Sequence, residues 1–306
     1  MRSLLLLSTA LFIGCVGGDD STIKDGGNDV TTNDSGSDVV STNDGSSEAD
    51  APQPFSPSTF GADLALWVIG DKVSVSGGNQ VDTWPDQSQH KTDLTQSTQS
   101  SRPLQEKGVL NGHDVVDFNG NSVRLEIDPG DAGTTPPNLS FGQDDDFAIS
   151  AVVSTAAGGS GSGFIWLKAH ELCNGSCTPT TGLVFGAGVV SPTDDSPALR
   201  IAPADPYLTA AGKLADHTFH LLTARRIGST TIQLRTDTVV KQANATAADV
   251  SVTDSSLYVG AGENLISGSF AFRVAEIVAV HRSGAPINDA DVANVETYLK
   301  AKYKTP

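Results

Sequence analysis

The residues of this chain best suited to chemistry are carboxylates that follow a strand-like run. Glu126 and Asp128 alternate along an extended segment, so their side chains would lie on one face. Retaining glycoside hydrolysis requires two carboxyl groups about 5–5.5 Å apart. A third acid, Asp131, follows, but Pro129-Gly130 interrupts the strand that would present it. We therefore interpret the segment as the edge of a solvated loop, with hydrolysis by Glu126 and Asp128 as an alternative.

A second group of acids, Asp144, Asp145 and Asp146, opens a predicted strand. Calcium is held in proteins by carboxylate, amide and carbonyl oxygens, so this triplet is a candidate calcium site. Consecutive acids also keep the edge of a sheet from pairing with other chains, and this explanation stays open. The sequence indicates no other cofactor.

Three further polar residues need an explanation. Asp86 and Asn119 lie on predicted loops and are candidate ligand-binding residues, because sugar sites orient their ligands with a few convergent polar groups. The alternatives are loop capping for Asp86 and a turn for Asn119. Glu276 lies in the middle of an apolar strand, where we expect it to make structural hydrogen bonds rather than to act in catalysis.

Two cysteines, Cys173 and Cys177, are separated by Asn174-Gly175-Ser176, a sequence that can turn tightly. In an exported protein we expect such a pair to form a disulfide. The alternatives are free thiols, or zinc held together with His170, for which no obvious fourth ligand is adjacent.

Composition and missing motifs exclude several functions. The 36 Asp and Glu residues outnumber the 19 Lys and Arg residues and give a net charge of −17 at pH 7. This balance argues against nucleic-acid binding, which needs cationic side chains to neutralise phosphates. The chain has no Gly-x-Ser-x-Gly, no His-Glu-x-x-His and no phosphate-binding glycine loop.

The elements that would position these residues are mostly strands. Ten or more short windows between residues 63 and 281 alternate or run apolar over strand length, which predicts an all-β fold of two antiparallel sheets. The last of them is apolar on both faces, with Phe272, Val274, Val278 and Val280 expected on one face. Such a strand belongs inside a layered structure.

One helix is predicted after this last strand. Asn288 is a suitable N-cap, and Asp291 three residues later completes a capping box. The apolar stripe that should dock the helix consists of Val292, Val295, Tyr298, Leu299 and Tyr303.

The first 56 residues differ from the rest in composition. Leu4 to Ile13 is an apolar run too short to span a bilayer, and it stops at Gly14-Cys15. This pattern resembles the lipobox of bacterial lipoproteins, which implies a signal peptide over residues 1–15 and a lipidated Cys15. An ordinary secretory signal is the alternative. Residues 16–56 are rich in Gly, Ser, Thr, Asn and Asp, which predicts a disordered acidic tether ahead of one domain at 57–306.

Several motifs of residues 57–306 resemble, in order and spacing, the concanavalin A-like, laminin-G-like jelly-roll domains of bacterial surface proteins. The motifs are Trp84-Pro-Asp-Gln-Ser88, Val115-Val-Asp-Phe-Asn-Gly120 and the ending Tyr298-Leu-Lys-Ala-Lys-Tyr303. Most of that family binds sugars or acts in adhesion. The resemblance therefore implies a jelly-roll sandwich that binds carbohydrates or glycoconjugates without catalysis. An adhesion or structural module that meets protein partners is the alternative.

Together these features predict an exported protein that a lipid anchor holds to the bacterial membrane, at the outer membrane or cell surface.

Replacing Cys15 tests the anchor. The Cys15→Ala variant should leave the membrane fraction as soluble exported protein, or keep an uncleaved signal, because no residue remains to be lipidated. Cell fractionation and intact mass of the full chain measure this, and wild-type behaviour of the variant would contradict the anchor.

Overall fold

The fold is built around β17 (Phe272–Arg282), the strand predicted to lie inside a layered structure. Along one edge it pairs with β8 (Asp146–Thr155), and along the other with β6 (His113–Phe118) and then β1 (Leu64–Ile69). All of these pairings are antiparallel. The layer continues from β8 through β13 (His220–Ile227), β14 (Thr231–Thr236) and β15 (Val239–Asn244).

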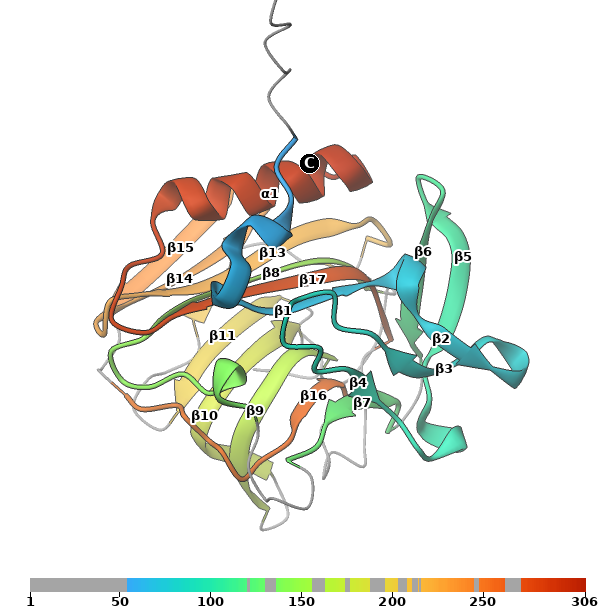
Figure 1. Cartoon of the computed structure of the whole chain (residues 1–306), viewed down its shortest axis with the longest axis horizontal. Helices are drawn as coiled ribbons and strands as arrows, with labels where there is room; N and C mark the ends of the chain where they lie inside the picture. Colours follow the sequence, from blue (N-terminus) through green and yellow to red (C-terminus); the bar gives the residue numbers. More distant parts are fainter. Residues whose placement is uncertain are drawn as a thin grey trace, which may run out of the picture. The chain divides into compact units, whose positions relative to one another are not determined.

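A second run of antiparallel strands lies below this layer in Figure 1. In order of pairing it comprises β7 (Arg124–Ile127), β16 (Leu257–Gly260), β9 (Gly163–Cys173), β10 (Cys177–Ala187), β11 (Pro197–Ala202) and β12 (Leu208–Thr209). Three strands connect the two runs, namely β5 (Leu104–Leu110), β3 (Gln80–Trp84) and β4 (Leu94–Thr95). A further strand, β2 (Ser74–Ser76), pairs with β3. The pairings therefore join 17 strands of the described residues into one sheet.

The computed structural model describes residues 54–119, 122–129, 136–155, 163–173, 177–187, 196–202, 208–210, 214, 216–244, 248–261 and 271–306. Within them, short 3-10 segments occur at Pro57–Asp63, Gly70–Lys72, Gly77–Asn79, Gln99–Ser101 and Pro137–Leu139, and the α-helix is α1 (Asp289–Tyr303). The predicted all-β antiparallel chain with a C-terminal helix is confirmed. The signal peptide, Cys15 and the tether up to residue 53 lie outside the described residues.

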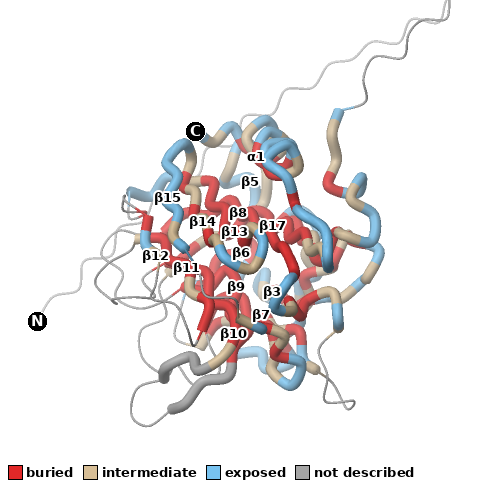
Figure 2. Tube along the Cα trace, turned by 90° about the vertical axis from the view of Figure 1, so that its left-hand side faces the viewer, coloured by how far each residue is buried: buried red, intermediate tan, exposed pale blue. Residues whose placement is uncertain are grey.

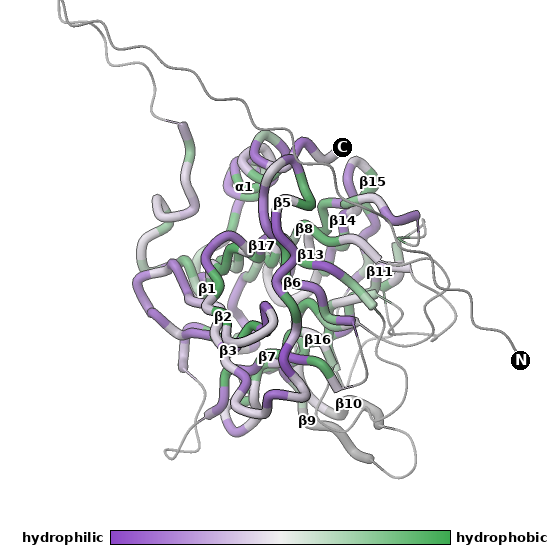
Figure 3. Tube along the Cα trace, turned by 90° about the vertical axis from the view of Figure 1, so that its right-hand side faces the viewer, coloured by the Kyte–Doolittle hydropathy of each residue, from purple (hydrophilic) through white to green (hydrophobic). Residues whose placement is uncertain are grey.

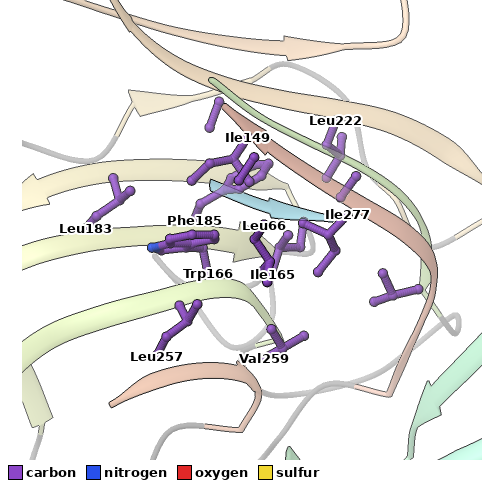
Figure 4. Packing of buried hydrophobic residues seen from close by; sticks show 14 of the residues in the cluster. Leu66, Ile149, Ile165, Trp166, Leu183, Phe185, Leu222, Leu257, Val259 and Ile277 are labelled. Atoms are coloured by element: carbon purple, nitrogen blue, oxygen red, sulfur yellow. The ribbon is translucent and has the colours of Figure 1, made fainter. Parts of the chain in front are cut away.

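The main core fills the space between the two runs of strands. Figure 4 shows side chains of both runs pointing toward one another, among them Ile149 and Ile277 from one and Trp166 and Phe185 from the other. Burial of this apolar surface is the main favourable term in folding. Trp84 and Trp166 are fully buried within this core. Figure 2 shows how burial varies across the fold, with buried strands in the middle and β15 exposed at the edge.

Helix α1 covers the opposite face of the β8–β17 layer (Figure 1). The Asn288 side chain accepts a hydrogen bond from the Asp291 N–H at 2.9 Å, and Asp291 accepts one from the Asn288 N–H at 3.1 Å, so the predicted capping box is confirmed. The predicted stripe is also confirmed, since Val292, Val295, Leu299 and Tyr303 are buried and Tyr298 is half-buried.

A buried carboxylate ties the helix to the sheet. Glu276 is fully buried and accepts hydrogen bonds from Trp67 Nε1 at 2.7 Å, Lys302 Nζ at 2.6 Å and Tyr303 Oη at 2.7 Å. Burial, with the nearby charge of Glu276, raises the pKa of the Tyr303 hydroxyl, so this group stays a donor. The structural hydrogen bonding expected of Glu276 is therefore confirmed.

An irregularity in β17 corrects one expectation. Phe272 and Val274 face the main core, whereas Val278 and Val280 face the helix. The register of β17 against β8 shifts between Val274 and Glu276, as in a β-bulge. Because side chains alternate with period two, one extra residue moves every later side chain to the other face. The four residues therefore do not share a face, as strict alternation had predicted.

The described residues fall within one compact unit, Pro52–Pro306. None of the helices in this part of the chain has the length and apolar composition needed to cross a membrane.

The docking of α1 can be tested at Leu299, which has no exposed surface. Leu299→Ala should lower the free energy of unfolding by about 2–5 kcal/mol, because it removes buried methyl groups and leaves a cavity. Thr297→Ala, on the exposed side of the same helix, should change stability by less than about 0.5 kcal/mol. Urea denaturation of the full chain measures both. Equal, negligible losses would mean that the helix is not docked.

Candidate functional site

A polar depression of about 150 Å³ lies where β6, β17 and β8 end side by side. Its lining comprises Asp117, Asn119, Ser154, His217, Ala271, Phe272 and Arg273. The register explains why three of these side chains converge. Arg273 is opposite Asp117 on β6 and opposite Ser154 on β8, and directly opposite residues point to the same side of a sheet. This is the side that α1 covers elsewhere. Val115 and Val152, two residues before Asp117 and Ser154, belong to the buried apolar cluster that packs against α1.

Asp117 is the unusual residue of this depression. It is only 8% exposed, and the described contacts supply its carboxylate with no hydrogen-bond donor. Burial raises its pKa from 3.8 to about 6; the charge of Glu106 also raises this pKa and that of Arg273 lowers it. The Asp117 oxygens border the depression and are not among the fully buried polar atoms that lack a partner, so a ligand or water can supply the donor there.

The guanidinium of Arg273 is engaged by a neighbouring strand. Its Nε lies 2.8 Å from Glu106 Oε2, and its Nη2 donates to Glu106 Oε1 at 3.3 Å. Two parallel hydrogen bonds of this kind fix an arginine in position. Arg273 therefore forms a rigid side of the depression, and its charge is largely balanced by Glu106 on β5.

The remaining polar groups have both donors and acceptors. Asn119 follows β6 and is exposed, Ser154 is 2% exposed, and His217 lies on the exposed turn before β13 with φ of 62°. The Asn119 amide and the Ser154 hydroxyl, together with Asp117, can exchange hydrogen bonds with a ligand that carries several hydroxyl groups. Figure 3 shows this side of the molecule, with hydrophilic residues along β5 and hydrophobic residues in β17.

Of the predicted site residues, Asn119 is the one that the structure places in this depression. Sequence reasoning missed Asp117, Ser154, His217 and Arg273 as members of one site. A signal for two of them was present, since Asp117 and Arg273 are charged residues that have an apolar neighbour on each side in the sequence. Their meeting depends on pairing between residues more than 150 positions apart, which one sequence does not reveal.

Asp86 has a structural position instead. It is 1% exposed, and its carboxylate accepts hydrogen bonds from the N–H groups of Trp67, Ser88 and Thr92 at 2.9, 2.9 and 3.0 Å, and from the Ser88 hydroxyl at 2.6 Å. These bonds hold the loop after β3 against β1. We assign Asp86 to this loop, and a ligand contact by it stays a prediction.

The acidic triplet does not converge on one point. Asp145 accepts hydrogen bonds from the Gly142 N–H at 2.6 Å and from His281 Nε2 at 3.0 Å. Asp146 accepts from the N–H groups of Gly228 and Ile287 at 2.6 and 3.0 Å, while Asp144 is exposed. In the part of the chain that the structure describes, no three His, Cys, Asp or Glu residues form a metal-binding group. The carboxylates of Asp145 and Asp146 instead fix the start of β8, and calcium binding stays a prediction.

The carboxylates considered for hydrolysis are not presented by one strand. β7 ends at Ile127, so Glu126 lies within it and the exposed Asp128 lies after it. Glu126 forms an ion pair with Arg124 at 3.4 Å. Asp131 lies outside the described residues.

The two cysteines face each other across the β9–β10 ladder, where Cys173 and Cys177 are register partners. Their side chains, like that of His170, lie outside the described residues. The disulfide therefore stays a prediction.

A larger cleft of about 590 Å³ lies between residues 54–63 and the first turns of α1. Phe55 and Phe60 line it with their rings 5.8 Å apart. Its cation, Arg282, is engaged by Asp63 at 2.7 Å and by Asp291 at 2.6 Å. These contacts fasten the segment before β1 to the sheet and the helix, and we treat the Asp117 depression as the candidate site.

No protein-family model matches the chain, and no curated protein matches it in sequence. Its fold does resemble solved structures. The binding domain of Paraclostridial Mosquitocidal Protein 1 has a TM-score of 0.53 at 11% identity, over 77% of this chain and 52% of that one. The botulinum neurotoxin serotype D ligand-binding domain, in complex with N-acetylneuraminic acid, has a TM-score of 0.51 at 9% identity, over 80% and 54%.

A third similar structure is the binding domain of botulinum neurotoxin DC in complex with rat synaptotagmin II. Its TM-score is 0.51 at 7% identity, over 78% of this chain and 52% of that one. The present chain thus spans about half the length of the structures it resembles. At these identities the likeness shows a shared β-rich fold.

The pKa of Asp117 predicts a pH effect on stability. Because the folded-state pKa of about 6 lies above the ordinary 3.8, the folded chain binds this proton more tightly than the unfolded chain. The resulting stability is complete below pH 3.8 and is lost as the pH rises to about 6. Asp117→Asn cannot titrate, so above pH 6 it should be more stable than wild type, by about 1–2 kcal/mol once screening by solvent is allowed for.

Denaturant unfolding of the full chain at pH 4 and pH 7.5 measures this difference. Asp144→Asn removes an exposed acid from the other end of β8 and serves as the control. If Asp117→Asn and the control shift alike with pH, the raised pKa of Asp117 is wrong.

Proposed function

We propose that this protein binds carbohydrates or glycoconjugates, without catalysis, in the depression around Asp117. The observation that carries the proposal is the buried carboxylate of Asp117, which lines an open depression and receives no hydrogen bond from the described residues. Sugar hydroxyls can supply the missing donors, and hydrogen bonds to an ionised acceptor are stronger than those between neutral groups. A site of about 150 Å³ is small beside the 300–1,000 Å³ of drug-sized ligand sites, so it suits a single sugar residue.

The similar solved structures support the same class of ligand. One of them is named as a complex with N-acetylneuraminic acid, which supports carbohydrate as the class of ligand and not this particular sugar. A fold by itself does not determine function, so the local chemistry of the depression has to carry the argument. The two agree, because convergent carboxylate, amide and hydroxyl groups are what a polyhydroxylated ligand needs.

The proposal also includes the type of β-sandwich and the cellular location of the protein. The two runs of strands with the core between them would be the two sheets of a jelly-roll sandwich. The Gly14-Cys15 sequence and the acidic segment that follows would hold this domain at the outer membrane or cell surface. Glycans of the cell surface would then be its partners.

Adhesion to a protein is the second candidate. It is favoured by one observation, that a structure of similar fold is named as a complex with rat synaptotagmin II. The depression gives no further support, because its lining is polar and small.

A glycan array probed with the full-length chain, with and without calcium, tests the proposal. Glycans that bind should then be titrated against Asp117→Asn and Asn119→Ala. Each variant should bind at least about tenfold more weakly, since each removes a hydrogen bond to the ligand. Asp144→Asn, at the far end of β8, is the matched control and should bind like wild type.

The outcomes separate the candidates. Binding without release of free sugar, lost in Asp117→Asn, supports the proposal. Sugar release would indicate a hydrolase and would overturn non-catalytic binding. No bound glycan, with a protein captured from the cell surface, would favour adhesion. Loss of binding in the calcium-free arm and in Asp144→Asn would move the site to the acidic triplet.

A further inference from the structure

The charges around the depression bear on the class of sugar that it accepts, an inference that rests on the proposed function. We propose that the depression recognises sugars without a negative charge and discriminates against acidic sugars such as sialic and uronic acids. This preference depends on which charges are already balanced within the protein and which remain for a ligand.

One edge of the Arg273 guanidinium is already engaged, and its charge is balanced by Glu106. Arg273 gives its Nε and Nη2 hydrogen bonds to Glu106, at 2.8 and 3.3 Å. An acidic sugar that sought the Nε and Nη2 edge of this guanidinium would have to displace Glu106, because that edge accommodates one carboxylate. The pair contributes almost no net charge to the ligand.

Asp117 therefore sets the charge that a ligand meets. It lies opposite Arg273 in the register of β6 and β17, and it is 8% exposed. A sugar carboxylate placed in the depression would meet a like charge with little water to screen it, which opposes binding. A sugar hydroxyl would instead donate to Asp117, whose oxygens have room for several donors.

The other groups do not reverse this preference. Asn119 and Ser154 are uncharged, and His217, the remaining lining residue that can become cationic, is exposed and screened by solvent and salt. The whole chain carries a net charge of −17, which slows the approach of anionic ligands.

The test uses the full-length chain and glycan pairs that share a core and differ only in a terminal sialic acid, titrated at pH 7.5. For every core that binds, the uncharged member should bind at least about tenfold more tightly than the sialylated member. Glu106→Gln removes the charge that balances Arg273, so it should raise the affinity for the sialylated member about tenfold. Glu126→Gln, which alters another Arg–Glu pair on β7, is the matched control and should leave the ratio unchanged.

Tighter binding of the sialylated members by wild type would overturn this inference while leaving carbohydrate binding intact. An unchanged ratio of the two affinities in Glu106→Gln would also overturn it. The pairing of Glu106 with Arg273 would then not be what disfavours the sialylated member. If the chain binds no member of any pair, the proposed carbohydrate binding itself is contradicted.

Discussion

The structure depends on one buried carboxylate. Glu276 has no exposed surface and receives hydrogen bonds from Trp67 of β1, and from Lys302 and Tyr303 of α1. A buried charge is tolerated only when it is paired and fully hydrogen-bonded, so these three donors must be in place together. Removing a single partner of such a group costs about 3–5 kcal/mol, a large share of the stability of an ordinary domain. One side chain thus joins the first strand, the central strand and the terminal helix.

The bulge that precedes Glu276 makes this arrangement possible. Before it, Phe272 and Val274 face the main core; after it, Val278 and Val280 face the helix. The same shift leaves Arg273 on the helix-bearing side, opposite Asp117 and Ser154. The candidate site and the helix anchor are therefore set by one local change of register within β17.

Much of the fold could be predicted from local sequence patterns, because capping, helical periodicity and turns depend on residues that are close together in the chain. The capping box of Asn288 and Asp291 and the stripe at Val292, Val295 and Leu299 needed only helical periodicity. The Asn111–Gly112 turn, with φ of 52° and 86°, needed only residues that tolerate positive φ. The faces of β17 could not be predicted, since the bulge is fixed by the pairing of β17 with β8. For the same reason Asn119 was found as a polar loop residue, whereas Asp117, Ser154 and Arg273 meet only through long-range register.

The hydrogen bond from Trp67 to Glu276 joins residues 209 positions apart, which affects how the chain is made. During synthesis at about 5–20 residues per second, β1 emerges roughly 10–40 s before β17 can pair with it. Such non-local contacts also fold slowly once all residues are present, because the closure of long loops precedes any gain from packing. Until then the buried apolar residues of β1, Leu64, Leu66 and Val68, have no partner strand. The nascent chain therefore passes through a period in which a strongly apolar strand is open to misassembly.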